Sequence, residues 1–236
     1  FDIVRIDHFR AFDSYWAINP SCETAVDGEW RYPKGYKFFD QLFTKFPNIQ
    51  IIAEDLGMLR DEVIELKDYY DLAGMRVLEF SFFEDEFTEN RNEKTNQIYY
   101  ITTHDNETLN QWVNSLSKEQ LSDIEKILKE QGFAGENVTE SLVLYALHRQ
   151  EKVVIISISD ILDLDENYRM NKPGIIDDLN WTFKLNNFDE LIKRIKIFNY
   201  LCIAYASKAF ADIIWKCIPY LNLFSETSTT SQTSNR

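Results

Sequence analysis

Short apolar runs alternate with amphipathic stretches along most of the chain. Five runs are rich in Val, Ile, Tyr and Phe and too short for helices of comparable burial, which predicts buried strands at residues 2–6, 49–53, 75–83, 97–103 and 153–159. The intervening stretches predict helices at residues 36–46, 60–69, 118–131 and 141–150. Strands that alternate with helices indicate a parallel sheet, either open or closed into a barrel.

Local sequence signals predict where one helix begins and ends, and a further helix near the C-terminus. Ser117, with Gln120 three residues later, predicts a capping box at the start of the third helix, and Gly132 predicts its end. Residues 188–200 predict an amphipathic helix, with one apolar face formed by Leu191, Ile192, Ile195 and Phe198.

Charge and cysteine content narrow the function classes. A net charge of −14 argues against nucleic-acid and anionic-membrane partners. Three cysteines without CxxC spacing favour a reducing compartment, so we expect a cytoplasmic protein. The apolar run at residues 197–207 is too short to span a bilayer. Because Phe1 is not an initiator Met and the chain begins at a predicted strand, we expect a fragment of a longer protein.

Acidic residues follow three of the predicted strands. RIDHFR places Asp7 after the first, IIAEDLG places Glu54 and Asp55 after the second, and YYITTHDNET places Asp105 after the fourth. A single Asp after a strand is commonly a helix cap or a loop acceptor. Three such acids favour catalysis, because the C-terminal strand ends of an α/β barrel converge on one site.

Several carboxylates without a Cys or Ser nucleophile are typical of retaining glycosyl transfer. That chemistry needs one ionised carboxylate as nucleophile and one protonated carboxylic acid as proton donor. Arg5 favours the ionised form of Asp7, since a nearby cation lowers a carboxyl pKa. The apolar run before Glu54 predicts a pKa raised by desolvation, which suits the proton donor.

The motifs VRIDHFRAFDSYWAI, IIAEDLG, GMRVLEFSF and YYITTHDNET closely resemble the 4-alpha-glucanotransferases, also called amylomaltases or disproportionating enzymes. GEWRYPKGYKFFDQL and RMNKPG continue the resemblance in order and spacing. It implies an α/β fold, an α-amylase-like (β/α)8 TIM barrel, present here as a fragment with strands 4 to 8. We therefore expect the C-terminal portion of the catalytic barrel at 1–187, a helical segment at 188–224 and a disordered polar tail at 225–236.

The resemblance also implies the roles of the site residues. Asp7 falls on the nucleophile that forms a covalent glucosyl-enzyme intermediate, Glu54 on the general acid/base, and Asp105 on the acid that stabilises the transition state. Residues expected to bind substrate are Arg5, His8, His104, Asn171 and Pro173. The implied activity transfers alpha-1,4-glucan segments between maltodextrin, starch or glycogen chains, with no metal and no other cofactor.

Two positions depart from the family pattern. Ala11 and Thr102 stand where the family commonly has Gly, and Thr102 places a branched side chain near the loop that carries Asp105. Transfer rather than hydrolysis rests on the resemblance alone, because both reactions share the covalent intermediate.

Two alternatives stay open. A metal-dependent hydrolase is one, because Asp7, His8, His104 and Asp105 are of metal-ligand type, although the chain has no HxH or HExxH spacing. The other is a truncated barrel that binds glucan without turnover. Half a barrel leaves open strand edges, so we expect the 236-residue chain alone to be inactive.

Overall fold

The structure is a computed structural model that describes residues 1–87, 96–149, 151 and 153–205. The chain forms two compact units. Unit 1 contains Phe1–Tyr100 and Gln150–Ile155, and unit 2 contains Ile101–Arg149 and Ile156–Arg236. Within the described ranges, the helices are too short or too polar to cross a membrane.

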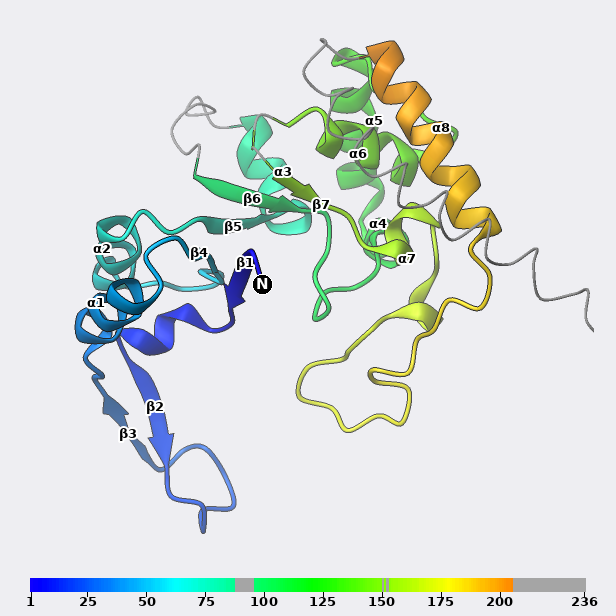
Figure 1. The fold of residues 1–236 in the computed structure, drawn as a ribbon. Helices are drawn as coiled ribbons and strands as arrows, with labels where there is room; N and C mark the ends of the chain where they lie inside the picture. The colour runs from blue at the N-terminus through cyan, green and yellow to red at the C-terminus, as the bar shows by residue number, and fades with distance from the viewer. Residues whose placement is uncertain (88–95, 150, 152, 206–236) are drawn as a thin grey trace, which may run out of the picture. The chain divides into compact units, whose positions relative to one another are not determined.

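Unit 1 contains five parallel strands, each starting at or within one residue of a predicted strand (Figure 1): β1 (Ile3–Ile6), β4 (Gln50–Ala53), β5 (Gly74–Val77), β6 (Gln97–Tyr100) and β7 (Val153–Ile155). β1 pairs with β4, and β5, β6 and β7 pair in order. A parallel bridge from Ile52 to Ala73 joins β4 to the start of β5. Neighbouring strands thus follow chain order, as in the wall of a (β/α) barrel, and the wall stays open within the described residues.

Two helices cover one face of this wall. Ile51 and Ala53 of β4 point into an apolar cluster beneath α1 (Gly35–Lys45) and α2 (Asp61–Tyr69). This cluster also contains Phe9, Phe39, Val63, Leu66 and Leu72. Ile52, between them, joins a second cluster with Met75, Val77, Ile98 and Tyr100. The alternation follows from the two-residue period of a strand and gives the wall a helix-covered face and an inner face.

A hairpin between β1 and α1 was not predicted. After the 3-10 helix η1 (Phe9–Phe12), β2 (Tyr15–Ile18) pairs antiparallel with β3 (Gly28–Arg31). The hairpin extends away from the rest of unit 1 (Figure 1). Trp16 and Trp30 are register partners, and their rings pack edge to face with centroids 5.4 Å apart.

Unit 2 is built around one buried helix. Nine of the ten residues of α6 (Val138–Leu147) are buried. Around α6 lie α4 (Leu109–Ser115), α5 (Lys118–Glu130), α7 (Ile158–Ile161) and α8 (Asp189–Tyr205), as Figure 1 shows. A short 3-10 helix, η2 (Glu166–Tyr168), follows α7. On the α6–α8 contact, Arg194 donates to the buried carboxylate of Glu140 at 3.0 Å.

The local helix signals are confirmed. Ser117 and Gln120 form the capping box of α5. Gly132 adopts φ +83°, and the N–H of Phe133 donates to the carbonyl of Leu128, which closes a Schellman motif. α8 buries Leu191 and Phe198 from the predicted apolar face. The predicted polar tail at 225–236 lies outside the described residues.

Three predicted strands are too long. The segment 97–103 ends as a strand at Tyr100, and the other two run on into helices. The segment 75–83 leaves the sheet at Val77 and continues as α3 (Leu78–Phe87). The segment 153–159 ends as a strand at Ile155, before α7. Apolar and polar residues alternate at 78–82 and at 156–159. This two-residue period is typical of a strand, which explains both of these errors.

Side-chain caps account for two helix starts. Ser157 accepts the N–H of Asp160 at the start of α7. Asn137 accepts the N–H of Glu140, so α6 begins three residues before the predicted start at 141. Gln150, the predicted end of that helix, lies outside the described residues. Polar caps therefore set these boundaries more firmly than the apolar pattern does.

A buried ion pair ties β4 to its neighbours in unit 1. Lys67 Nζ lies 2.6 Å from Asp55 Oδ2, and the side chains are 7% and 6% exposed. Asp55 Oδ1 accepts the N–H of Met75 at 2.7 Å. A Cβ at Gly74 would lie 2.5 Å from Asp55 Oδ2, so glycine makes room for the carboxylate.

Substituting Lys67→Met should lower the free energy of unfolding by about 3–5 kcal/mol, because Asp55 would be left as an unpaired buried charge. Arg31→Met is the matched control. It removes an exposed partner of Glu29 and should cost about 1 kcal/mol or less. Urea unfolding of both variants measures the difference, and equal costs would contradict the structural role of the Asp55–Lys67 pair.

Candidate active site

The pairing of β1 with β4 orients Arg5 and Asp7. Arg5 is the register partner of Ile52, so its side chain shares the inner face of the wall. Asp7, two residues later, meets Arg5 on that face, and Arg5 Nη2 donates to Asp7 Oδ1 at 2.8 Å. The Asp7 side chain is 70% exposed. This arrangement offers a carboxylate that is paired with a cation and that a ligand can reach.

A tight turn after β1 connects Asp7 to Glu54. His8 adopts φ +48°, in the left-handed region, and sends the chain into η1. The N–H of His8 donates to Glu54 Oε2 at 2.8 Å, and the N–H of Leu56 donates to Oε1 at 3.2 Å. The N–H of Phe9 reaches the carbonyl of Glu54 at 3.0 Å. The segment that carries Asp7 therefore also orients the Glu54 carboxylate.

Tyr100 marks the inner face beside this group. Its side chain is buried, and burial raises the pKa of the Tyr100 hydroxyl, whereas the charge of Arg5 opposes that shift. Arg5 is therefore the ion-pair partner of Asp7, and its charge also favours the ionised form of the Tyr100 hydroxyl.

In unit 2, Asp105 lies at the centre of a hydrogen-bonded group. Asn171 Nδ2 donates to Asp105 Oδ1 at 2.6 Å, and His104 Nε2 lies 3.2 Å from Oδ2. Arg169 donates to the main-chain carbonyl of Asp105 at 2.8 Å. Pro173 follows Asn171 on the same loop and is exposed. The Asp105 side chain is 47% exposed, so its carboxylate is both held in place and accessible.

Asp160 stabilises the segment that carries Asp105 through hydrogen bonds. This buried carboxylate accepts the hydroxyl of Thr102 on Oδ2 and the N–H of Leu109 on Oδ1. Burial raises the pKa of Asp160, and these hydrogen bonds oppose the shift. The structure thus accommodates the branched side chain of Thr102, because its hydroxyl satisfies a buried acid.

The predicted site residues divide between the units. Unit 1 brings together Arg5, Asp7, His8 and Glu54, and unit 2 brings together His104, Asp105 and Asn171. Convergence of all three acids on one site stays a prediction.

Sequence reasoning assigned no role to Asp160, Arg169 or Trp181. Arg169 belongs to the RMNKPG motif. Asp160 is the one charge within SISDIL, a signal for a buried, paired acid. Trp181, whose ring centroid lies 5.3 Å from that of His104, gave no comparable signal.

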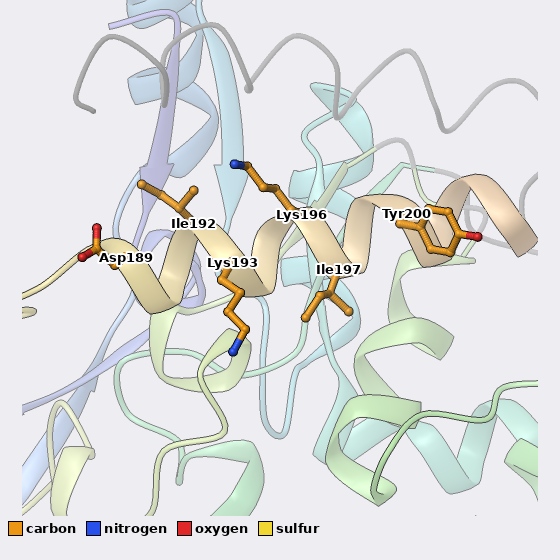
Figure 2. A pocket seen from close by; sticks show the side chains of 6 residues that line it. All are labelled: Asp189, Ile192, Lys193, Lys196, Ile197 and Tyr200. Atoms are coloured by element: carbon orange, nitrogen blue, oxygen red, sulfur yellow. The ribbon is translucent and has the colours of Figure 1, made fainter. Parts of the chain in front are cut away.

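A pocket on unit 2 is separate from these residues. It lies along one side of α8 (Figure 2), and its lining consists of Asp189, Ile192, Lys193, Lys196, Ile197 and Tyr200. None of the predicted site residues lines it.

The described part of the chain provides no ligand set for the alternative of a metal-dependent hydrolase. No group of three or more His, Cys, Asp or Glu side chains there is arranged to hold a metal ion.

Comparison with known proteins connects both groups of residues to one family. A sequence profile described as 4-alpha-glucanotransferase matches residues 1–190. The 4-alpha-glucanotransferase of Aquifex aeolicus is 37% identical over 175 residues, which are 74% of this chain and 36% of that protein. The chloroplastic/amyloplastic 4-alpha-glucanotransferase of Solanum tuberosum is 34% identical over 196 residues, 81% of this chain and 34% of that protein.

Solved structures agree with the profile. The amylomaltase from Streptococcus agalactiae in complex with acarbose superposes with a TM-score of 0.77 at 29% identity, over 87% of this chain and 41% of that one. Amylomaltase from Corynebacterium glutamicum, 13% identical with a TM-score of 0.54 over 76% of this chain and 31% of that one, supports the fold alone. The chain spans about a third of the length of the curated relatives it matches. The expected fold, a fragment of an amylomaltase-type barrel, is thereby confirmed, and the chain belongs to the 4-alpha-glucanotransferase family.

Proposed function

We propose that the gene product containing this chain transfers alpha-1,4-glucan segments between maltodextrin, starch or glycogen chains through a covalent glucosyl-enzyme. The observation that carries the proposal is the pair of carboxylates at adjacent parallel strand ends. Asp7 accepts a hydrogen bond from Arg5 Nη2 at 2.8 Å, and Glu54 accepts one from the N–H of His8, the residue next to Asp7. Family membership supports the same chemistry.

In the first step, Asp7 attacks the anomeric carbon and forms a glycosyl ester. Glu54 protonates the departing glycosidic oxygen, so the leaving sugar departs neutral. In the second step, Glu54 removes the proton from an acceptor hydroxyl, which attacks the anomeric carbon and releases Asp7. An acceptor sugar gives transfer, and water would give hydrolysis.

In this proposal, Asp105 and its neighbours Asn171 and His104 bind the sugar substrate. Asp105 accepts sugar hydroxyls on its exposed carboxylate while Asn171 and His104 fix its orientation. The proposed substrate-binding residues are Arg5, His8, His104, Asn171 and Pro173.

The activity is proposed for the full gene product, because the chain spans only about a third of its curated relatives. We still expect the 236-residue chain alone to be inactive. We infer a cytoplasmic location from the cysteine pattern; the potato relative bears a chloroplastic/amyloplastic name.

Incubating the full gene product with maltotriose tests the function. We expect glucose together with a ladder of longer maltodextrins. Glucose and maltose without longer products would show hydrolysis instead of transfer. The absence of turnover would contradict the proposed activity.

Asp7→Asn should lower the transfer rate by roughly 10⁴-fold or more, because the intermediate cannot form, while acarbose still binds. Asp2→Asn, an exposed acid just before the same strand, is the control and should keep wild-type activity. Product ladders and calorimetric titration measure the two effects. Full activity of Asp7→Asn would remove Asp7 from the nucleophile role.

Glu54→Gln should lower transfer from maltotriose by about 10²–10⁴-fold, since the leaving oxygen is no longer protonated. A maltosyl substrate with an activated leaving group needs no such proton and should give a burst of that group. Glu62→Gln, on the exposed start of α2, is the control. Equal losses with both substrates would contradict the acid role.

A further inference from the structure

Residues 170–181, here called the Trp181 loop, form a closed and internally bonded loop in unit 2. The N–H of Trp181 donates to the carbonyl of Met170 at 2.8 Å, which joins the two ends. The N–H of Lys172 donates to Asn180 Oδ1 at 3.0 Å. A compact loop with paired ends presents its side chains in a fixed position.

Both ends of the Trp181 loop contact the His104–Asp105 turn. Near its first end, Asn171 donates to Asp105. At its last residue, the Trp181 ring lies 5.3 Å from the His104 ring, with the planes inclined by 37°. The two contacts place Trp181 beside the acid group of unit 2.

Trp181 combines a strained backbone with an exposed ring. Its φ of +65° lies in the left-handed region, which a bulky residue rarely adopts. Its side chain is nevertheless not part of a core, since the residue is 61% exposed. Strained residues persist where the surrounding structure determines them and are frequent at ligand sites.

We propose that Trp181 is a further sugar-binding residue whose exposed indole face stacks on a glucose unit beside His104 and Asp105. A pyranose ring has an apolar C–H face and a hydroxyl-rich edge. An indole covers the first, and polar groups such as Asp105 and His104 bind the second. The inference rests on the proposed function, in which His104 and Asp105 bind sugar.

The test measures acarbose binding by the full gene product and its variants with calorimetry and tryptophan fluorescence. Trp181→Ala should weaken acarbose binding about tenfold, and Trp181→Phe, which keeps an aromatic face, should stay within about threefold of wild type. The fluorescence change on binding should vanish in Trp181→Phe and persist in the control Trp112→Phe.

Wild-type affinity in Trp181→Ala, or a fluorescence change that persists in Trp181→Phe, would overturn the inference. The second result would leave Trp181 as a packing contact for His104. Should Trp181→Ala fail to fold, the fluorescence of Trp181→Phe decides. If the wild type forms the ladder and Asp105→Asn abolishes it while Trp181→Ala binds normally, only the inference fails. A wild type that neither binds acarbose nor makes the ladder overturns the proposed function and the inference together.

Discussion

The backbone pairing of β1 with β4 is the constraint on which the unit 1 site depends. Their register runs from Ile3 opposite Gln50 to Ile6 opposite Ala53. It continues beyond the strands, because Glu54 donates its N–H to Ile6 and accepts that of Phe9 on its carbonyl. A shift by one residue would turn Arg5 onto the helix-covered face and separate it from the inner face. The register that forms the sheet thus also sets the geometry of the proposed catalytic residues Asp7 and Glu54.

Glu54 and Asp55, the adjacent carboxylates of the motif IIAEDLG, have different partners. Glu54 turns toward the chain after β1, where backbone N–H groups of His8 and Leu56 bind it. Asp55 turns the other way, into the buried pair with Lys67. A strand end supports this division, because successive side chains leave the sheet on opposite faces. The structural acid fixes the backbone from which the proposed chemical acid extends.

Features encoded within a few residues could be predicted from the sequence. The Ser117 capping box and the turn at Gly132 belong to this class, as do the strand ends that carry Asp7 and Glu54. The pattern could not separate strand from helix after Val77, since residues 78–82 alternate between apolar and polar as a strand does. SISDIL indicates a buried acid at Asp160 but does not identify its distant partner Thr102. The contact of Trp181 with His104 spans tens of residues, and no local pattern predicts it.

The backbone donors to Glu54 have a consequence for the proposed mechanism, in which Glu54 acts first as acid and then as base. A residue that serves as acid in one half-reaction and base in the next changes its charge twice per cycle. A side-chain partner that titrates could change its own protonation state at each step and so release the carboxyl. Backbone amides carry no ionisable proton in this range, so the N–H groups of His8 and Leu56 remain donors in both states. In the proposed mechanism, the Glu54 carboxyl can therefore lose and regain its proton without a change in its orientation.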